Sequence, residues 1–429
     1  MDSNVPKWYR LAWFLGKPPP LSRLQWKILG LVAAVSIFEQ YDVYLFALNL
    51  KQIQQELLIP ESDLGLLGAL VRAGSFFAIF FALAADRWGR RRLLLITVIG
   101  YTLLTGATAL APNAEMFVIF QFLARGFASA EIMIAAVVIA EEFPHEHRGW
   151  GLGALAALQA LGAGLAALAF VFVDAVPFGW RSLYALGLIP LLLIINWRRT
   201  LPETTRFKVI ASTQLKSGYI KPLIGLFKHN PGRSLALFTI TFIFAIASSS
   251  AGFFAPKYLQ DVHSWTPAAV GILNILGGAF AIIANPLAGR LSDRKGRRPV
   301  AMIFAICYVL AVGFFYSATG MILPLLWVVM IFFVFGSDVT QTAYSTELFP
   351  TDHRSTASGF RNVIGTMGGI VGLSSISALF VVFQSNWTSV IVLSLVGLLI
   401  PILVWLFLPE TSNRTLEETS GDNVDQKDP

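Results

Sequence analysis

Twelve long apolar runs constrain this sequence more than any other feature. A bilayer core of roughly 30 Å needs about 20 apolar residues per helix. The runs cover residues 28–50, 63–85, 93–112, 114–141, 150–173, 181–199, 234–256, 267–289, 299–319, 321–346, 355–383 and 387–408. Because helices satisfy their own backbone hydrogen bonds in lipid, the pattern predicts an all-α membrane protein.

The composition excludes several classes of soluble protein. Hydrophobic residues make up 55% of the chain and charged residues 13%, whereas roughly 25% of an average soluble domain is charged. An ordinary cytosolic enzyme, a disordered protein and a nucleic-acid binder are therefore excluded. The net charge of +7 lies on short loops between the apolar runs. One cysteine, Cys307, excludes a disulfide framework and a cysteine-rich metal site.

The distribution of Lys and Arg predicts the orientation in the membrane. Of the 32 basic residues, only Lys51, Arg181 and Lys257 fall in the loops after odd-numbered spans. Nearly all the others lie in the tails and the opposite loops, so the positive-inside rule places both termini in the cytoplasm. The first residues are polar and basic and carry no cleavage site, so we expect no removable signal peptide. The short loops favour a bacterial inner membrane.

Three motifs recur at offsets of 206 or 207 residues. Asp86-Arg-Trp-Gly-Arg-Arg returns from Asp293, Glu141-Glu-Phe-Pro returns as Glu347-Leu-Phe-Pro, and a Leu-Pro-Glu-Thr box occurs twice. Two six-helix repeats around a central cleft are typical of secondary transporters, which bind substrate near the bilayer midplane. The expected parts are an N-tail (1–27), a first bundle (28–200), a linker (201–233), a second bundle (234–408) and a C-tail (409–429).

The motifs resemble those of a known family. The segment Gly289-Arg-Leu-Ser-Asp-Arg-Lys-Gly-Arg-Arg298 contains the complete G-x-L-x-D-R-x-G-R-R signature of the major facilitator superfamily. The boxes that begin at Leu201 and Pro409 are similar to those of its sugar porter branch. The resemblance implies a fold of twelve helices in two pseudo-symmetric bundles. Ser248 to Ser250 stand where hexose carriers have paired glutamines, which argues against a hexose.

Four charged residues lie inside the helices at a similar depth, and three of them are candidates for proton coupling. Glu39 and Asp42 share one face of the first helix, and a rise of about 1.5 Å per residue places Arg72 and Arg125 in the same layer. Burial disfavours an ionised carboxylate and a nearby arginine favours it, so an arriving anion can switch its protonation. We predict that Glu39, Asp42 and Arg125 couple transport to protons, and the resemblance implies the same for Asp42. A static salt-bridge network is the alternative.

Other polar residues inside the helices are candidates for substrate binding. Glu131 occupies the place of an acidic residue in bacterial organic-acid and sialate porters, and Gln121 that of the sugar porter arginine. A polar stripe at spacings i, i+3, i+4 and i+7 lies on the tenth helix and consists of Asp338, Gln341, Thr342 and Ser345. Snorkelling of Arg72 and a helix–helix hydrogen bond of Asn274 remain alternatives. The expected substrate-binding residues are Arg72, Gln121, Glu131, Gln159, Asn274, Asp338, Gln341 and Arg361.

The loop motifs predict a latch on the cytoplasmic side. The resemblance implies that Asp86 docks on helix 11 and Asp293 on helix 5. The alternative is that the arginines of these loops only enforce topology. The expected gating residues are Asp86, Arg90, Glu141, Arg148 and Glu203, with their counterparts Asp293, Arg297, Glu347, Arg354 and Glu410. His145-Glu-His147 has no third ligand, so no metal is expected.

These observations favour a transporter over an enzyme. No nucleophile elbow or ATP-binding loop occurs, so uphill transport must use an ion gradient. We predict a monomeric proton-coupled symporter that imports a small polar metabolite, such as an organic acid, by alternating access. Its partners would be the substrate, protons and the lipid bilayer, without nucleic acid or a cofactor. The alternatives are a uniporter, a proton-coupled exporter of sugars or organic ions, and a transporter-like nutrient sensor.

Overall fold

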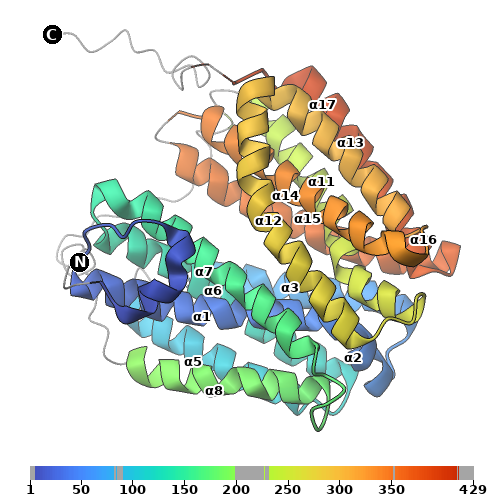
Figure 1. The fold of residues 1–429 in the computed structure, drawn as a ribbon, viewed down its shortest axis with the longest axis horizontal. Coiled ribbons are helices and arrows are strands. Elements are labelled where there is room, and N and C mark those ends of the chain that lie inside the picture. Colours follow the sequence, from blue (N-terminus) through green and yellow to red (C-terminus); the bar gives the residue numbers. More distant parts are fainter. Residues whose placement is uncertain are drawn as a thin grey trace. The chain divides into compact units, whose positions relative to one another are not determined.

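A computed structural model describes residues 5–81, 84, 90–198, 227, 231–350, 353–412 and 414. Every regular element in these ranges is a helix (Figure 1), in agreement with the predicted all-α class. The chain divides into two compact units. Unit 1 comprises Met1–Ile59, Leu70–Lys216 and Thr266–Ile272, and unit 2 comprises Pro60–Ala69, Ser217–Trp265 and Leu273–Pro429. Most of the predicted linker, 201–233, lies outside the described residues.

The helices follow the predicted runs closely. In the first half they are α1 (Arg23–Leu48), α2 (Leu50–Glu56), α3 (Leu64–Ala73), α5 (Arg90–Ala109), α6 (Ala114–Glu142), α7 (Arg148–Phe170) and α8 (Trp180–Arg198). In the second half they are α11 (Pro231–Asp261), α12 (Pro267–Lys295), α13 (Arg297–Phe315), α14 (Leu323–Glu347), α15 (Arg354–Phe383), α16 (Asn386–Ser394) and α17 (Leu399–Phe407). Short 3₁₀ segments include η1 (Lys7–Leu15), η2 (Glu61–Asp63), η3 (Gly74–Phe77) and η7 (Leu395–Leu398).

Eleven helices among the described residues are long and apolar enough to cross a membrane. The remaining predicted span, 181–199, contains a shorter apolar helix at Trp180–Leu192. The span Glu61–Phe81 includes α3 and η3, and the span Asn386–Phe407 joins α16, η7 and α17. Two predicted single helices therefore contain 3₁₀ turns, which are common where a helix tightens or bends.

The first helix begins at Arg23 rather than at residue 28. Ser22 caps it, because the Ser22 hydroxyl accepts from the Gln25 backbone and the Gln25 side chain returns to the Ser22 N–H. The preceding segment η1 belongs to the core of unit 1. Its Tyr9 ring lies 5.0 Å from the ring of Trp26. The expected N-tail is thus partly folded against α1.

The two units repeat one packing scheme. In unit 1, α1 packs most extensively on α7 and α5 on α6, while in unit 2, α11 packs on α15 and α13 on α14. Glycines allow the close approach of α1 to α7 and of α11 to α15. A Cβ at Gly162 would collide with the Ile37 carbonyl oxygen, and a Cβ at Gly368 would lie 2.5 Å from that of Phe242. Small residues at such crossings are typical of membrane helices.

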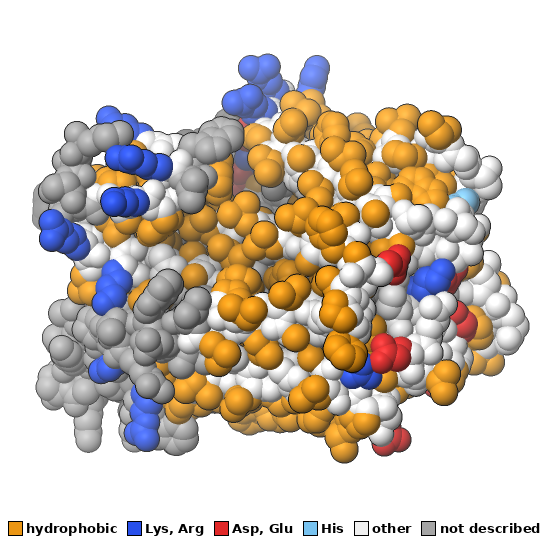
Figure 2. All heavy atoms as spheres, turned by 60° about the horizontal axis from the view of Figure 1, so that its bottom comes forward, with side chains coloured by type: hydrophobic (Ala, Val, Ile, Leu, Met, Phe, Trp, Pro, Cys, Tyr) orange, Lys and Arg blue, Asp and Glu red, His pale blue; other side chains and the backbone are white. Residues whose placement is uncertain are grey.

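The surface is suited to a bilayer. Figure 2 shows apolar side chains over the middle of the visible face, with charged side chains toward its ends. Exposed large apolar residues occur in both units, among them Phe80, Leu103, Ile282 and Trp405. In an aqueous environment such extensive apolar exposure would be unfavourable. The exposed apolar residues therefore agree with the spans.

Candidate functional site

Three carboxyl groups are buried within unit 1. Glu39 and Asp42 on α1 expose 2% and 6% of their surface, and Glu131 on α6 exposes 1%. Their charges act on one another: Asp42 and Glu131 both interact electrostatically with Glu39. Charged groups at this depth of a membrane helix are costly and usually have a function.

Polar side chains of α5 and α6 surround these carboxyl groups. The Thr97 hydroxyl donates to Glu131 Oε2 at 2.8 Å. The Gln121 side chain forms a hydrogen bond with Asp42, and its Nε2 donates to Thr108 Oγ1 at 3.2 Å. Arg125, one helical turn after Gln121, interacts electrostatically with both Asp42 and Glu39. The predicted proton-coupling residues thus share one electrostatic environment.

Two further predicted substrate-binding residues of unit 1 are half-buried. Arg72 is half-buried at the end of α3, and the charge of Arg125 acts on it. Gln159 is half-buried on α7.

Sequence reasoning missed several neighbours of the carboxyl groups. The phenol groups of Tyr101 and Tyr184 are within electrostatic range of Asp42. Ser75 accepts a hydrogen bond of 3.2 Å from Arg125 Nε. Tyr, Ser and Thr are frequent in membrane helices, so their residue type gave no signal. Their contact with charged groups becomes visible only in the packed unit.

In unit 2, the predicted polar stripe on α14 divides between two environments. Asp338 and Thr342 are exposed, whereas Gln341 is 5% exposed and Ser345 is fully buried. Gln341 lines a small interior cavity of unit 2 together with Ser337, Thr340 and mostly apolar residues. The four residues therefore do not form one continuous binding surface.

Asp338 and Arg361, two of the predicted substrate-binding residues, form an ion pair with each other. Arg361 Nη1 lies 2.9 Å from Asp338 Oδ1, and the pair joins α14 to α15. Asn274 is half-buried on α12.

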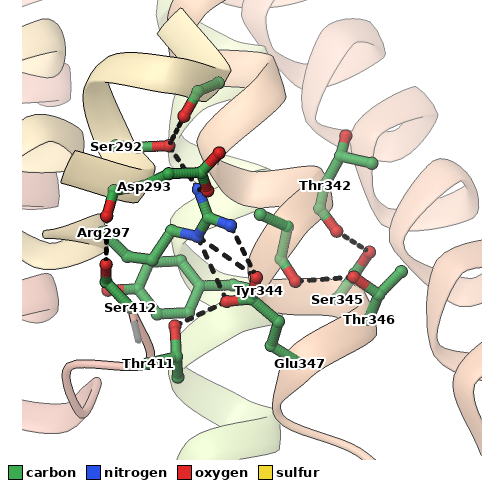
Figure 3. Close-up of polar contacts among 12 residues, drawn as sticks. Ser292, Asp293, Arg297, Thr342, Tyr344, Ser345, Thr346, Glu347, Thr411 and Ser412 are labelled. Carbon is green, nitrogen blue, oxygen red and sulfur yellow. Dashed lines mark hydrogen bonds and ion pairs between the residues drawn. The ribbon is translucent and has the colours of Figure 1, made fainter. Parts of the chain in front are cut away.

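Three predicted gating residues of unit 2 form a connected network, namely Asp293, Arg297 and Glu347 (Figure 3). Arg297 pairs with Asp293 at 2.6 Å and with Glu347 at 2.8 Å. Thr411 donates to Glu347 Oε2 at 2.6 Å, and Ser412 donates to the Asp293 carbonyl oxygen at 2.6 Å. The network thereby joins the ends of α12, α13 and α14 to the chain that follows α17.

Glu410 closes the network by capping α13. Its carboxylate accepts from the backbone N–H groups of Arg297 at 2.7 Å and Arg298 at 3.1 Å. A carboxylate at a helix N-terminus satisfies free N–H groups and complements the helix dipole. Gly296 makes room for it, because its φ is +101° and a Cβ there would lie 2.6 Å from Glu410 Oε2. The positive φ and the short distance to Glu410 therefore explain why the repeated motif has a glycine at position 296.

Unit 1 repeats part of this network. Arg90 pairs with Glu141 at 3.2 Å, as Arg297 pairs with Glu347 in unit 2. Arg148 Nε donates to the Phe143 carbonyl oxygen at 3.2 Å, and Arg354 makes the equivalent bond in unit 2. The predicted gating residues Asp86 and Glu203 lie outside the described residues.

The sequence profile of the Major Facilitator Superfamily matches residues 32–337 and 237–424. The chain belongs to the major facilitator superfamily. The predicted family is therefore confirmed, and with it the all-α fold of a multi-pass membrane transporter.

Relatives and solved structures agree with this assignment. The superfamily chain is 26% identical over 375 residues to the cis,cis-muconate transport protein of Acinetobacter baylyi, covering 82% of this chain and 87% of the relative. It is 23% identical over 438 aligned residues to the niacin transporter of the same organism, covering 93% and 97%. The inward open xylose transporter XylE from E. coli has the same fold, with a TM-score of 0.73 and 18% identity, covering 92% and 99%.

One charged cluster of this superfamily transporter was not predicted. The sequence placed Lys257 in a loop, but it lies inside α11 and is 1% exposed. It pairs with Glu61 at 2.8 Å and with Asp261, and its ammonium lies 5.7 Å from the centre of the Trp387 ring. The sequence reasoning was wrong here because the helix continues past the apolar run to Asp261. The signal available was the i, i+4 spacing of Lys257 and Asp261.

Among the described residues of this superfamily member, no group of three or more His, Cys, Asp or Glu side chains is placed to hold a metal. The charged clusters of unit 1 instead combine carboxyl groups with guanidinium groups. Such a combination can hold a proton and bind an anion.

Proposed function

We propose that this superfamily transporter is a proton-coupled symporter that imports a small organic acid. The observation that carries the proposal is the buried pair Glu39 and Asp42, whose charges interact with Arg125. The relatives named for muconate and niacin support the substrate class, because both compounds carry carboxyl groups.

The proposed coupling follows from the electrostatics of Arg125. Arg125 interacts electrostatically with Asp42 and Glu39, and a positive charge beside a carboxyl group favours its ionised form. A substrate carboxylate bound to Arg125 offsets that positive charge. Asp42 or Glu39 then takes up a proton, so proton and acid are loaded together. Release of the acid on the other side restores Arg125 and expels the proton.

The other predicted roles form part of the same proposal. We place two six-helix bundles (28–200 and 234–408) around the substrate, joined by the linker 201–233, with the tails 1–27 and 409–429 in the cytoplasm of a bacterium. The chain would act as a monomer. Substrate contacts beyond Arg125 would come from Arg72, Gln121, Glu131, Gln159, Asn274, Asp338, Gln341 and Arg361. Gating would involve Asp86, Arg90, Glu141, Arg148, Glu203, Asp293, Arg297, Glu347, Arg354 and Glu410.

Transport into proteoliposomes tests the coupling. Labelled nicotinate and cis,cis-muconate serve as probes, with an acidic exterior and protein-free liposomes as the blank. We expect the wild type to accumulate a probe above its external concentration. Asp42→Asn should accumulate at least tenfold less while still exchanging labelled for unlabelled probe, because it can bind the acid but cannot carry the proton.

Asp174→Asn is the matched control, since this carboxylate is exposed in the loop before α8. It should accumulate as much probe as the wild type. Equal accumulation by wild type and Asp42→Asn would contradict coupling at Asp42. Exchange that is equally fast at every pH, without accumulation, would identify a uniporter instead.

A further inference from the structure

Arg72 occupies an unusual position for a charged residue. It lies near the middle of the span Glu61–Phe81, about 16 Å from the first residue at 1.5 Å per residue. Arginines that reach the membrane surface by snorkelling lie near helix ends. Arg72 is far from both ends of its span and is half-buried. Its charge therefore needs a partner inside the membrane.

The backbone around Arg72 brings it close to α6. Directly after α3, η3 runs as a 3₁₀ helix from Gly74 to Phe77. A Cβ at Gly74 would collide with the Phe122 carbonyl oxygen, and a Cβ at Gly126 would lie 3.0 Å from the Gly74 carbonyl oxygen. Two glycines thus let η3 and α6 cross at backbone contact. Ser75, beside this crossing, accepts from Arg125 Nε at 3.2 Å.

Few of the hydrogen-bond donors of the two arginines are used. The charge of Arg125 acts on Arg72. Within the described residues, Arg72 takes part in no ion pair or hydrogen bond, and Arg125 donates only through Nε to Ser75. Each guanidinium has five N–H donors. Unsatisfied donors and adjacent like charges are unfavourable in a membrane, so an anion from outside the chain fits this position.

The carboxyl groups of unit 1 do not supply that anion to Arg72. Asp42 and Glu39 interact electrostatically with Arg125, but among the described residues neither carboxyl group forms an ion pair or hydrogen bond with Arg72. Neither carboxyl group therefore neutralises Arg72 through an ion pair.

We propose that Arg72 and Arg125 form a clamp for the substrate carboxylate, and that Arg72 determines the preference for acids over their neutral amides. This inference rests on the proposed function and assigns the selectivity of the same site. Guanidinium groups bind carboxylates through paired, charge-assisted hydrogen bonds. A carboxamide has the same shape but no negative charge, and its NH₂ group would meet further N–H donors.

Binding of matched acids and amides to the purified full-length protein in detergent tests the clamp. The probes are nicotinate with nicotinamide and benzoate with benzamide, and the thermal shift at several concentrations yields each Kd. The wild type should bind the acid at least tenfold more tightly than its amide. Arg72→Gln should weaken acid binding at least tenfold and change amide binding less than twofold. Arg72→Lys should recover most of the acid preference.

The ligand-free melting temperature separates this role from a structural one. Removing an unpaired charge should leave the Tm of Arg72→Gln equal to the wild type or higher. A lower Tm, or a variant that does not fold, would mean that Arg72 holds the fold and would overturn the clamp. The exposed Arg10→Gln is the control for loss of one positive charge and should change neither Kd.

The outcomes also distinguish this inference from the proposed function. Acid preference in the wild type that persists in Arg72→Gln would overturn the clamp but leave proton-coupled acid import intact. Equal loss of acid and amide binding would overturn it too. A wild type that binds no carboxylate better than its amide would contradict both proposals.

Discussion

Asp42 and Glu39 each have one carboxyl oxygen that lacks a hydrogen-bond partner among the described residues. A buried acceptor without a partner costs about 1–3 kcal/mol. Gln121 forms a hydrogen bond with Asp42, so one oxygen of that carboxyl group has a partner and the other has none. A complete set of hydrogen bonds would favour one protonation state of a carboxyl group. The incomplete hydrogen bonding of Asp42 and Glu39 therefore agrees with groups that gain and lose a proton.

Gly296 provides a prediction about stability. Gly296→Ala should lower the free energy of unfolding by about 2 kcal/mol, because a φ of +101° disfavours alanine and its Cβ would displace Glu410 from α13. Thermal unfolding in detergent measures the change. Gly313→Ala, on the same helix with no atom near its Cβ, should unfold at the wild-type temperature or above. Equal melting temperatures for both variants would contradict the proposed cap.

The transition from α3 to η3 shows how one element prepares a site. Gly74 interrupts the α-helix just after Arg72, and the 3₁₀ turn that follows contacts α6 across Gly126. A regular helix packed at ordinary distance would separate Ser75 from Arg125. The crossing therefore brings the guanidinium of Arg125 to Ser75 and close to Arg72.

Gly74→Ala should disturb this crossing. The added methyl group meets a backbone carbonyl that cannot rotate away, so we expect a loss of about 2 kcal/mol in unfolding free energy. Nicotinate binding should weaken at the same time, because Arg72 and Arg125 separate. Gly164→Ala in α7, which has no atom within 4 Å of its Cβ, is the control and should affect neither measurement. Normal binding by Gly74→Ala would show that the crossing does not position the arginines.

The molecule as a whole consists of two units in which equivalent residues make equivalent contacts. Arg90 and Arg297 each pair with a glutamate of the next helix, and Arg148 and Arg354 each donate to a phenylalanine carbonyl. The units also differ: the buried carboxyl groups of α1 and α6 have no equivalent on α11 and α14 beyond the exposed Asp338. The contacts that the two units share involve the residues proposed for gating, whereas the buried carboxyl groups that differ between the units belong to the proposed coupling site.

Cysteine labelling can test the orientation of the whole chain. Because Cys307 is the single cysteine, Cys307→Ala gives a background without thiols. In that background, Ser264→Cys, in the exposed loop after α11, should react with a membrane-impermeant maleimide on intact cells. Ser420→Cys, in the C-tail, should react only after the membrane is permeabilised. The reverse pattern would invert the proposed topology.

Much of the fold could be predicted because its signals are local. The length of each apolar run gives a span, and the spacing of the repeated motifs gives two halves. The layer shared by Glu39, Asp42 and Arg125 followed from helical rise alone, since a bilayer orders every residue along one axis. Errors arose where a helix continued past its apolar run, as at Lys257, or began before it, as at Arg23.

The sequence alone did not determine the rotation of each helix about its own axis or the distance between the axes of neighbouring helices. These depend on side-chain volumes from several helices at once, which is why Gln341 turned inward while Asp338 stayed exposed. The same reason explains Glu410, which reaches the start of α13 from the far end of the chain. The depth of a residue in the membrane and the chemical type of its side chain can be read from one segment of sequence. Its contact partners depend on how several helices pack together.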